Sequence, residues 1–382
     1  MTPEEIELLS QLTVVIPTFN RPLDLERAIE YWRDTPVTAH ILDGSKKQSF
    51  QVGVLPDVPN ITYHHIPSKL GEYRVINYLR RLEFATTLTK TRYSALCGAD
   101  DAFSVSGLVT LLRLMENDSD VDAVVGQTLG FYPREGVVRW WLRYGPSSVG
   151  NSFSGDSDAM VRLRHGSLRS FYGVVRTDLW NKRIRIIKDH AWLEERWETL
   201  VNDVSSALFR ATSINNVIWF RFKTVRHPQE ATIMPMREWA NARGNDLEIN
   251  LYIDVLVEAI LHESHGLDQD KIKKKIRKFI NNHPESRGKL PRLKTLKIVV
   301  LTKLFSRLDE NIINNLPTIF RKIAMRYHIP AKIAAAIGPK RVLDEFLPSL
   351  LKSEISFDLD ELKNLEKLWL KPREELRLKA NI

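Results

Sequence analysis

Two adjacent carboxylates follow an apolar segment of the sequence at the point where a strand is expected to end. The apolar segment is residues 93–97, and Asp100 and Asp101 come after Gly98. Neighbouring anions repel each other unless a cation joins them. Hard oxygen ligands of this kind suit Mg²⁺ or Mn²⁺, which commonly bind one or two carboxylates together with diphosphate oxygens. The pair would serve equally well as the acidic first turn of a following helix.

A second polar loop follows the first apolar run of the chain. Residues 12–16 are mostly β-branched, which predicts a buried strand, and they lead into Pro17, Thr18, Asn20 and Arg21. In open α/β sheets, ligands bind beyond the carboxyl ends of the strands. Turn formation alone also favours polar residues after strands, so each such loop by itself is weak evidence for a binding site.

A third polar loop follows the expected strand at residues 38–42. Asp43 closes that strand, and its carboxylate could accept a hydrogen bond from a nucleobase N–H or a ribose hydroxyl, or it could cap a turn. Lys69 and Arg74 flank Gly71 just before an expected helix, which is a suitable place for phosphate oxygens. The spacing matches neither a P-loop nor a dinucleotide-binding loop.

A later acidic stretch holds the candidates for a general base. Asp203 lies on an expected helix, and Glu194 and Glu195 precede it. A general base needs a carboxylate near the reacting hydroxyl, although an ordinary acidic helix start explains the same residues. His227 is a candidate metal ligand, with a turn histidine as the alternative.

The elements expected around these residues alternate between strands and helices, which predicts an α/β fold with a mainly parallel sheet covered on both faces. We expect strands at residues 12–16, 38–42, 61–66, 93–97 and 121–125 and helices at residues 22–32, 71–88 and 105–115. Further helices are expected at residues 271–280, 293–308, 312–327, 329–337 and 359–370. The pattern turns helical and basic near Gly266, which predicts two domains, 1–266 and 267–382.

Charge is unevenly distributed along the chain. Its 382 residues carry a net charge of +9, and residues 268–382 alone hold 26 Lys and Arg against 14 Asp and Glu. Such a basic helical region suits an anionic membrane surface, while a solvated helical bundle or a dimerising region would show the same composition. No nucleic-acid-binding module is recognisable, so nucleic acid is not an expected partner.

Composition excludes several classes of protein. A hydrophobic content of 43% and a charged content of 27% are ordinary for a globular protein. Cys97 is the only cysteine, which excludes an intrachain disulfide framework and a cysteine-built metal site. The acidic start is unlike a secretory signal and no long apolar run occurs, so we expect a cytoplasmic protein, peripheral on the membrane if its tail binds there.

The strand-end motifs, in this order, resemble the family 2 glycosyltransferases with the GT-A fold. Residues 13–21 are similar to the family's first strand, residues 43–45 to its nucleotide-contacting loop, residues 71–77 to the start of a helix, and residues 98–101 to its DxD motif. The similarity extends over about residues 11–235. It implies a GT-A Rossmann-like sheet, followed here by an α-helical C-terminal region.

The resemblance also implies roles for individual residues. A nucleotide-sugar donor would be held by Pro17, Thr18, Asn20 and Asp43, with a divalent metal joining its diphosphate to Asp101 and Asp100. The segment at residues 202–210 is similar to a later acidic motif of the family, which makes Asp203 the implied catalytic base of an inverting displacement.

Two positions depart from the family's pattern. Gly98 stands where the DxD motif has its first carboxylate, so His227 becomes a further candidate ligand. Asn202 stands where a Glu usually precedes the base, which keeps Glu194 and Glu195 as rivals to Asp203.

The function expected from these observations is transfer of a sugar to a saccharide or lipid-linked acceptor in surface polysaccharide or glycoconjugate biosynthesis. Transfer of a nucleotide-activated polyol phosphate on the same fold is one alternative. A catalytically inactive binding or scaffold module is another, because the DxD motif is altered.

Overall fold

The computed structural model describes residues 1–55, 57–69, 72, 74–134, 136–142, 158–165, 173–190, 196–222, 236–242, 244–263, 268–282, 342–351 and 355–380. The helices expected at residues 293–308, 312–327 and 329–337 lie outside these residues. The same is true of Gly71 and of three candidate site residues, Glu194, Glu195 and His227.

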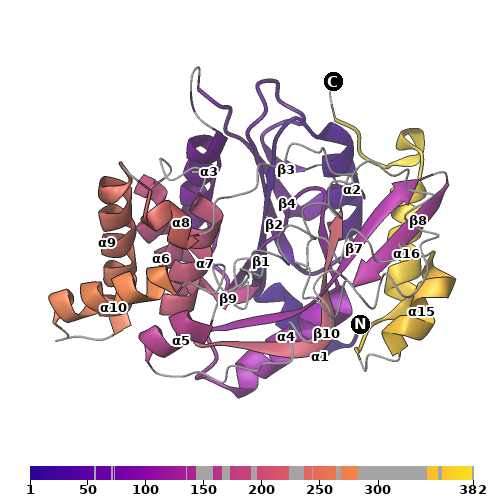
Figure 1. The fold of residues 1–382 in the computed structure, drawn as a ribbon. Helices are drawn as coiled ribbons and strands as arrows, with labels where there is room; N and C mark the ends of the chain where they lie inside the picture. The colour runs from indigo at the N-terminus through magenta and orange to yellow at the C-terminus, as the bar shows by residue number, and fades with distance from the viewer. Residues whose placement is uncertain are drawn as a thin grey trace, which may run out of the picture.

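A mixed ten-stranded sheet forms the centre of the protein (Figure 1). Its order is β3-β4-β2-β1-β5-β9-β7-β10-β6, with β8 paired to β7. The strands are β1 (Leu12–Thr18), β2 (Thr38–Asp43), β3 (Gly53–Leu55), β4 (Val58–His65), β5 (Tyr93–Leu96), β6 (Ala102–Phe103), β7 (Ala123–Arg134), β8 (Val137–Leu142), β9 (Val174–Arg176) and β10 (Ala211–Phe222). Strands β4, β2, β1 and β5 run parallel to one another, so their carboxyl ends meet at one edge.

Helices cover both faces of this sheet, as the sequence predicts. They are α1 (Pro3–Ser10), α2 (Pro22–Trp32), α3 (Arg74–Leu88), α4 (Val105–Asn117), α5 (Ala159–His165), α6 (Thr177–Ile187), α7 (Trp197–Leu208), α8 (Met236–Ala240), α9 (Asp246–Glu263), α10 (Gln269–Asn281), α15 (Leu343–Leu351) and α16 (Leu359–Leu370). Alternate residues of β1 separate the two faces: Val15 joins the core beneath α3, and Val14 and Ile16 join the core beneath α2 and α4.

The second half of the sheet contains strands that the sequence did not predict. Strand β9 pairs antiparallel with both β5 and β7, and β6 pairs antiparallel with β10. Strands β6 and β9 are only two and three residues long, too short for a period-two pattern. Strand β10 begins with polar residues and carries a register shift between Ser213 and Val217, which hides its alternation.

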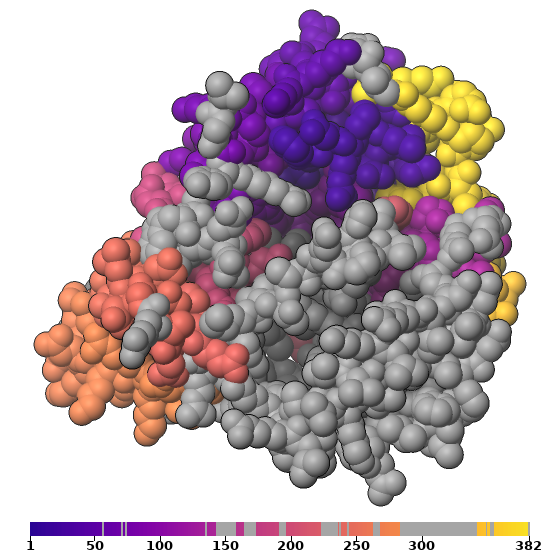
Figure 2. Space-filling view, turned by 45° about the horizontal axis from the view of Figure 1, so that its top comes forward, coloured from indigo at the N-terminus to yellow at the C-terminus, as the bar shows by residue number. Residues whose placement is uncertain are grey.

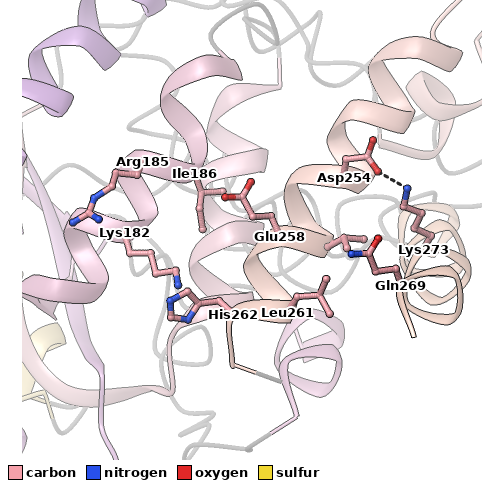
Figure 3. Close-up of a pocket in the computed structure, with 10 residues that line it drawn as sticks. Lys182, Arg185, Ile186, Asp254, Glu258, Leu261, His262, Gln269 and Lys273 are labelled. Atoms are coloured by element: carbon pink, nitrogen blue, oxygen red, sulfur yellow. Dashed lines mark ion pairs between the residues drawn. The ribbon is translucent and has the colours of Figure 1, made fainter. Parts of the chain in front are cut away.

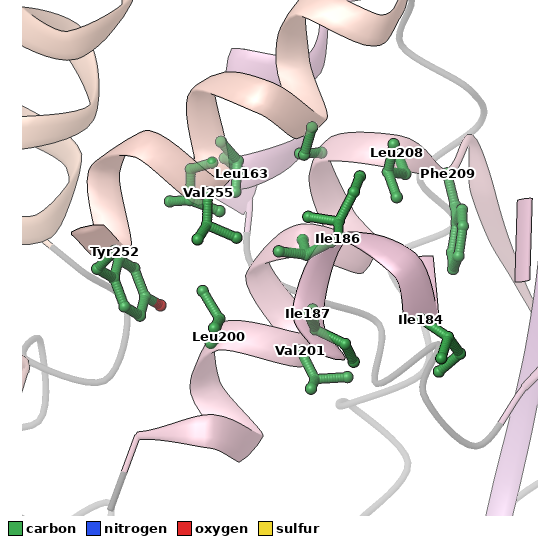
Figure 4. Packing of buried hydrophobic residues seen from close by; sticks show 14 of the residues in the cluster. Leu163, Ile184, Ile186, Ile187, Leu200, Val201, Leu208, Phe209, Tyr252 and Val255 are labelled. Atoms are coloured by element: carbon green, nitrogen blue, oxygen red, sulfur yellow. The ribbon is translucent and has the colours of Figure 1, made fainter. Parts of the chain in front are cut away.

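The core beneath α3 continues into a helical layer formed by α5, α6, α7 and α9 (Figure 4). Leu200 and Val201 of α7 pack there near Ile187 of α6 and Tyr252 of α9. Apolar residues of α10 extend the same core, since Ile276 is fully buried. The expected helix at residues 271–280 is therefore confirmed, while the domain boundary near Gly266 stays a prediction.

The last described segment returns to the sheet. In Figure 1, α15 and α16 lie beside β8, on the opposite side of the molecule from α9 and α10. Trp369 of α16 is 1% exposed, and its ring centroid lies 5.1 Å from that of Phe131 on β7. The expected helix at residues 359–370 is confirmed. No helix of the described residues is long and apolar enough to cross a membrane.

Candidate functional site

The loops after β1, β2 and β5 are joined to one another by hydrogen bonds and an ion pair. The backbone N–H of Gly44 donates to the carbonyl oxygen of Thr18 at 3.0 Å. The backbone N–H of Asn20 donates to Oγ of Ser45 at 2.8 Å, and Arg21 forms an ion pair with Asp100. Asn20 adopts a positive φ of 53°, which turns the chain after β1 and suits asparagine. The structure therefore brings together the three polar loops that the sequence singled out.

Asp43 holds the second of these loops from inside the protein. It is completely buried, and its two carboxylate oxygens accept four hydrogen bonds. The backbone N–H and the hydroxyl of Ser45 donate to Oδ1 at 2.8 and 2.5 Å. The hydroxyls of Ser49 and Tyr63 donate to Oδ2 at 2.9 and 2.6 Å. These bonds fix Ser45, and through Ser45 they fix Asn20.

A buried guanidinium lies beneath the ends of β1 and β2. Arg81 of α3 is 4% exposed and donates to the carbonyl oxygens of Thr18 and Leu42 at 2.6 and 3.0 Å. A Cβ at Gly44 would stand 2.7 Å from Oδ1 of Asn77 and 2.9 Å from Cζ of Arg81, so this approach requires glycine. Sequence analysis missed Arg81, because nothing local distinguishes it from other polar residues of an amphipathic helix, whereas Asn77 ends the segment at residues 71–77 that carries part of the resemblance.

The loop after β5 presents Asp100 and Asp101 differently. The Asp100 side chain is 24% exposed and pairs with Arg21. Asp101 is 6% exposed, and its Oδ1 accepts a hydrogen bond from the backbone N–H of Phe222 at 2.9 Å. A Cβ at Gly98 would lie 2.9 Å from Oδ1 of Asp100, so Asp100 occupies the space that a side chain at position 98 would need.

Further charges surround this acidic loop. Burial and the negative charge of Asp100 raise the pKa of Asp24 on α2. Burial, followed by the charges of Asp101 and Asp100, raises the pKa of the Cys97 thiol. Among the described residues, no group of three or more His, Cys, Asp or Glu side chains could hold a metal ion.

The segment before α3 is organised by a carboxylate. Glu72 accepts hydrogen bonds from the backbone N–H of Lys69 at 2.9 Å and from Nδ2 of Asn77 at 3.3 Å. It also forms an ion pair with Arg80 at 3.1 Å. Lys69 is exposed, and Arg74 is the first residue of α3. The two predicted phosphate-binding cations thus flank a turn that Glu72 holds together.

Asp203 lies in the middle of α7. It is 5% exposed and accepts a hydrogen bond from the Tyr252 hydroxyl of α9 at 2.7 Å. The beginning of α7 contacts α3, because the ring centroids of Trp197 and Tyr78 are 5.3 Å apart. The sequence-predicted base is therefore embedded between helices, whereas the loops after β1, β2 and β5 lie at the sheet edge.

Two adjacent tryptophans of β8, Trp140 and Trp141, are part of the core. Trp140 is fully buried, and its indole N–H donates to Oε1 of Glu366 at 2.6 Å. Trp141 is 5% exposed and covers Gly130, where a Cβ would lie 2.1 Å from the indole. Both rings pack inside the protein, as most aromatic residues do.

No protein-family model and no curated protein matches the chain. Among solved structures, residues 1–349 of S. aureus TarS match with 11% identity and a TM-score of 0.43, covering 94% of this chain and 90% of that one. The same fragment in complex with UDP-GlcNAc matches with 13% identity and a TM-score of 0.41, covering 88% and 91%. The mannosyltransferase PcManGT from Pyrobaculum calidifontis, in complex with GDP-Man and Mn²⁺, matches with 14% identity and a TM-score of 0.34, covering 86% of each chain. Likeness at this level does not assign an activity, which depends on the site itself.

Proposed function

We propose that this protein is a glycosyltransferase that moves a sugar from a nucleotide-sugar donor to a saccharide or glycoconjugate acceptor. The observation that supports it is the joining of the β1, β2 and β5 loops at the carboxyl edge of a parallel sheet, where α/β proteins bind nucleotides. The buried guanidinium of Arg81 lies beneath two of the loops and favours an anion above it. Among the described residues, the buried Thr18 hydroxyl there has no hydrogen-bond partner, so it can donate to a ligand.

A divalent cation, Mn²⁺ or Mg²⁺, fits the carboxylates on the third loop. Asp101 and Asp100 would hold it, and the bound cation would offset the charge of the donor's diphosphate. Asp101 is held by the N–H of Phe222 through one oxygen, which fixes the direction of the carboxylate. Arg21 is 45% exposed, so it can leave Asp100 at little cost and turn toward a phosphate oxygen.

The reaction we propose is a single inverting displacement. The acceptor hydroxyl oxygen forms a bond to the anomeric carbon, the bond from that carbon to the diphosphate oxygen breaks, and a carboxylate takes the hydroxyl proton. Asp203 stays the base predicted by resemblance, with Glu194 and Glu195 as rivals. Asp203 is 5% exposed and bound by the Tyr252 hydroxyl, so its neighbourhood would need to change before this carboxylate met an acceptor.

We also propose that the protein works in the cytoplasm at an anionic membrane surface, with α10 as the contact. Lys274, Lys275 and Lys278 are exposed on this helix, opposite its buried apolar stripe. Next to α10, a cavity of about 620 Å³ lies between α6, α9 and α10, and Figure 3 shows Lys182 pointing toward His262 within it. Cations in this number suit phosphate groups of lipids, each adding about 1 kcal/mol near the surface.

A binding module without catalysis is the second candidate, and the ion pair between Arg21 and Asp100 favours it. This guanidinium already neutralises one of the two carboxylates that a metal would need. The module would bind a nucleotide without metal, using Arg81 and the joined loops, and would transfer nothing.

The deciding experiment is titration of the protein with nucleotides, with and without Mn²⁺. UDP, GDP, CDP and CMP would be tested by calorimetry and by thermal shift against wild type, Asp101→Asn and Lys363→Ala, an exposed α16 variant that serves as the control. A ligand at about a hundred times its Kd stabilises the folded state by about 2.7 kcal/mol, which is readily seen.

The proposal predicts that one nucleotide binds more tightly with Mn²⁺, and that Asp101→Asn removes the metal effect while Lys363→Ala does not. Binding that ignores both Mn²⁺ and Asp101 would support the binding module instead. A response to CDP alone would direct the search toward CDP-activated polyols as donors. Absence of binding by all four nucleotides would end the nucleotide-sugar proposal.

A further inference from the structure

A half-buried carboxylate from α16 lies at the beginning of α4. Oε2 of Glu361 accepts hydrogen bonds from the hydroxyls of Ser104 and Ser106 at 2.6 and 3.0 Å. Oε1 accepts from the backbone N–H of Val105 and from the Tyr31 hydroxyl, the latter at 3.1 Å. More than 250 residues separate Glu361 from these α4 partners in sequence. The carboxylate therefore joins α16 to the first turn of α4 and to α2.

The position of α16 is fixed by other contacts as well. Glu366 accepts the hydrogen bond of the Trp140 indole on β8. Ahead of the helix, Ser356 fills the irregular part of β10, since its N–H donates to Asn215 at 2.9 Å and its carbonyl accepts from Val217 at 2.8 Å. After the helix, Arg373 bonds the fully buried Glu26 of α2 at 2.6 Å. Figure 2 shows this segment, in yellow, lying against the N-terminal residues, in indigo.

The first turn of α4 lies only three residues after Asp101. Ala102 and Phe103 form the short strand β6, which ends at Ser104, the N-cap of α4. Strand β6 pairs only with β10 among the described strands, so one ladder of two residue pairs holds it. Tyr31 adds a second constraint, because its one hydroxyl hydrogen is shared between the carbonyl oxygen of Phe103 at 2.6 Å and Oε1 of Glu361 at 3.1 Å. Glu361 contacts both Tyr31 and Ser104, and it therefore supports β6 where the sheet does not.

We propose that Glu361 is a positioning residue for the loop that carries Asp100 and Asp101. This proposal rests on the proposed function, in which the loop binds the donor's diphosphate and the divalent cation. Through Ser104, Val105 and Tyr31, the α16 carboxylate fixes the start of α4 and the two residues of β6, and these fix Asp101 against Phe222 of β10. The segment that contains α16 is thus part of the support of the nucleotide site.

A carboxylate suits this position because every group around it donates. The N-terminal turn of a helix has unpaired N–H groups and a partial positive charge, which an anion satisfies. Ser104 also accepts from the N–H of Gly107 at 3.0 Å, so its own hydrogen is available to Glu361. Burial raises the pKa of Glu361 although its four donors oppose that rise. A glutamine is neutral and keeps one acceptor oxygen, and it can therefore replace much of the contact.

The experiment compares three variants of the full chain: Glu361→Ala, Glu361→Gln and Glu366→Ala. Glu366 is the matched control, since it lies on the same helix and makes one buried hydrogen bond to β8. Amide hydrogen exchange would be followed in peptides covering residues 98–108, β8 and α16. In parallel, the Kd would be measured with Mn²⁺ for whichever of UDP, GDP, CDP and CMP binds the wild-type protein most tightly.

We expect Glu361→Ala to speed exchange at residues 101–107 and to raise the Kd by about tenfold, the equivalent of one lost hydrogen bond to the loop's support. Glu361→Gln should keep most of the slow exchange at residues 101–107 and most of the nucleotide affinity of wild type. Glu366→Ala should speed exchange in β8 and α16 and leave residues 101–107 and the Kd unchanged.

Unchanged exchange at residues 101–107 in Glu361→Ala would overturn the proposal. So would an equal effect of Glu366→Ala on those residues, because it would mean that general loosening of α16 is enough. An unchanged Kd with faster exchange would also overturn it, since the loop's order would then not matter for binding. If wild type bound no nucleotide, the proposed function would fail, and the exchange data alone would decide whether α16 orders the loop.

Discussion

Replacement of Asp43 separates two roles for this carboxylate: holding the loop after β2, or contacting a bound nucleotide directly. Its oxygens already accept four hydrogen bonds, and the residue is completely buried. A buried donor that loses its acceptor costs about 1–3 kcal/mol. In Asp43→Ala, the serine hydroxyls can rotate toward other acceptors, whereas the N–H of Ser45 and the Tyr63 hydroxyl have fixed directions. Two such losses give a destabilisation of about 2–6 kcal/mol.

Asp43→Asn should cost much less. The amide oxygen can face the N–H and hydroxyl of Ser45, and the amide nitrogen can donate to the oxygens of Ser49 and Tyr63. Only the carboxylate charge and the hydrogen bond donated by Tyr63 are lost, so we expect a destabilisation of about 1–2 kcal/mol. Tyr63→Phe is the matched control. It removes one of the four donors together with the oxygen that accepts from the N–H of Ser49 at 2.9 Å, and it should cost about 1–3 kcal/mol. Denaturant unfolding followed by tryptophan fluorescence measures all three values.

Nucleotide affinity distinguishes the two roles. If Asp43 acts by holding the loop, Tyr63→Phe weakens binding together with stability, because the loop loses a support. If Asp43 contacts the nucleotide, Tyr63→Phe leaves binding unchanged or improves it, because one carboxylate oxygen is released. The reasoning is refuted if Asp43→Ala destabilises the protein by less than about 1 kcal/mol, since four buried hydrogen bonds would then be worth almost nothing.

Three further predictions concern single residues. Gly44→Ala should destabilise the protein by about 1–3 kcal/mol and abolish nucleotide binding, because the new Cβ would meet Asn77 and Arg81, both buried; unfolding and calorimetry measure this. Burial, with a smaller contribution from His64, lowers the pKa of His40 to about 4, which is below the value in the unfolded chain. The neutral imidazole therefore contributes its full share of folding stability above pH 6.5, and this share is lost as the pH falls toward 4. After allowance for its partial exposure, His40→Gln should therefore remove about 1–2 kcal/mol of the difference in stability between pH 7 and pH 4.5, whereas an unchanged pH profile would contradict the assignment. Cys97 is completely buried with a raised pKa, so a thiol reagent should label it only after unfolding, and labelling of native protein would show that the β5 loop opens.

The sequence predicted the elements whose signal is local. The run at residues 12–16 is β-branched and ends near a proline, and it forms β1. Pro22 opens α2 as a first helical residue does, and the apolar residues that follow at helical spacing are its buried face. The convergence of the polar loops also followed from the sequence, because parallel strands end at the same edge.

The parts that were not predicted depend on contacts between distant residues. In the sequence, Asp43 looks like a free carboxylate at a strand end. In the structure, the hydroxyl of Tyr63, 20 residues later, donates a hydrogen bond to one of its oxygens. Arg81 reaches Thr18 across 63 residues. Asp203 fits a motif by its neighbours in sequence, yet α9 brings Tyr252 to it from 49 residues away. No local sequence pattern encodes any of these long-range contacts.

The site therefore depends on completion of the fold more than on the loops themselves. Each loop is short, and its backbone alone does not specify one conformation. The cross-links that specify it are side chains from β4, α3 and α16, which reach the loops only after the sheet and its two helical layers have packed. A nucleotide that recognises the three loops together would bind the fully packed state and not a partly folded one. Nucleotide binding should accordingly stabilise β4, α3 and α16 as one unit, although α16 lies on the far side of the sheet from α3.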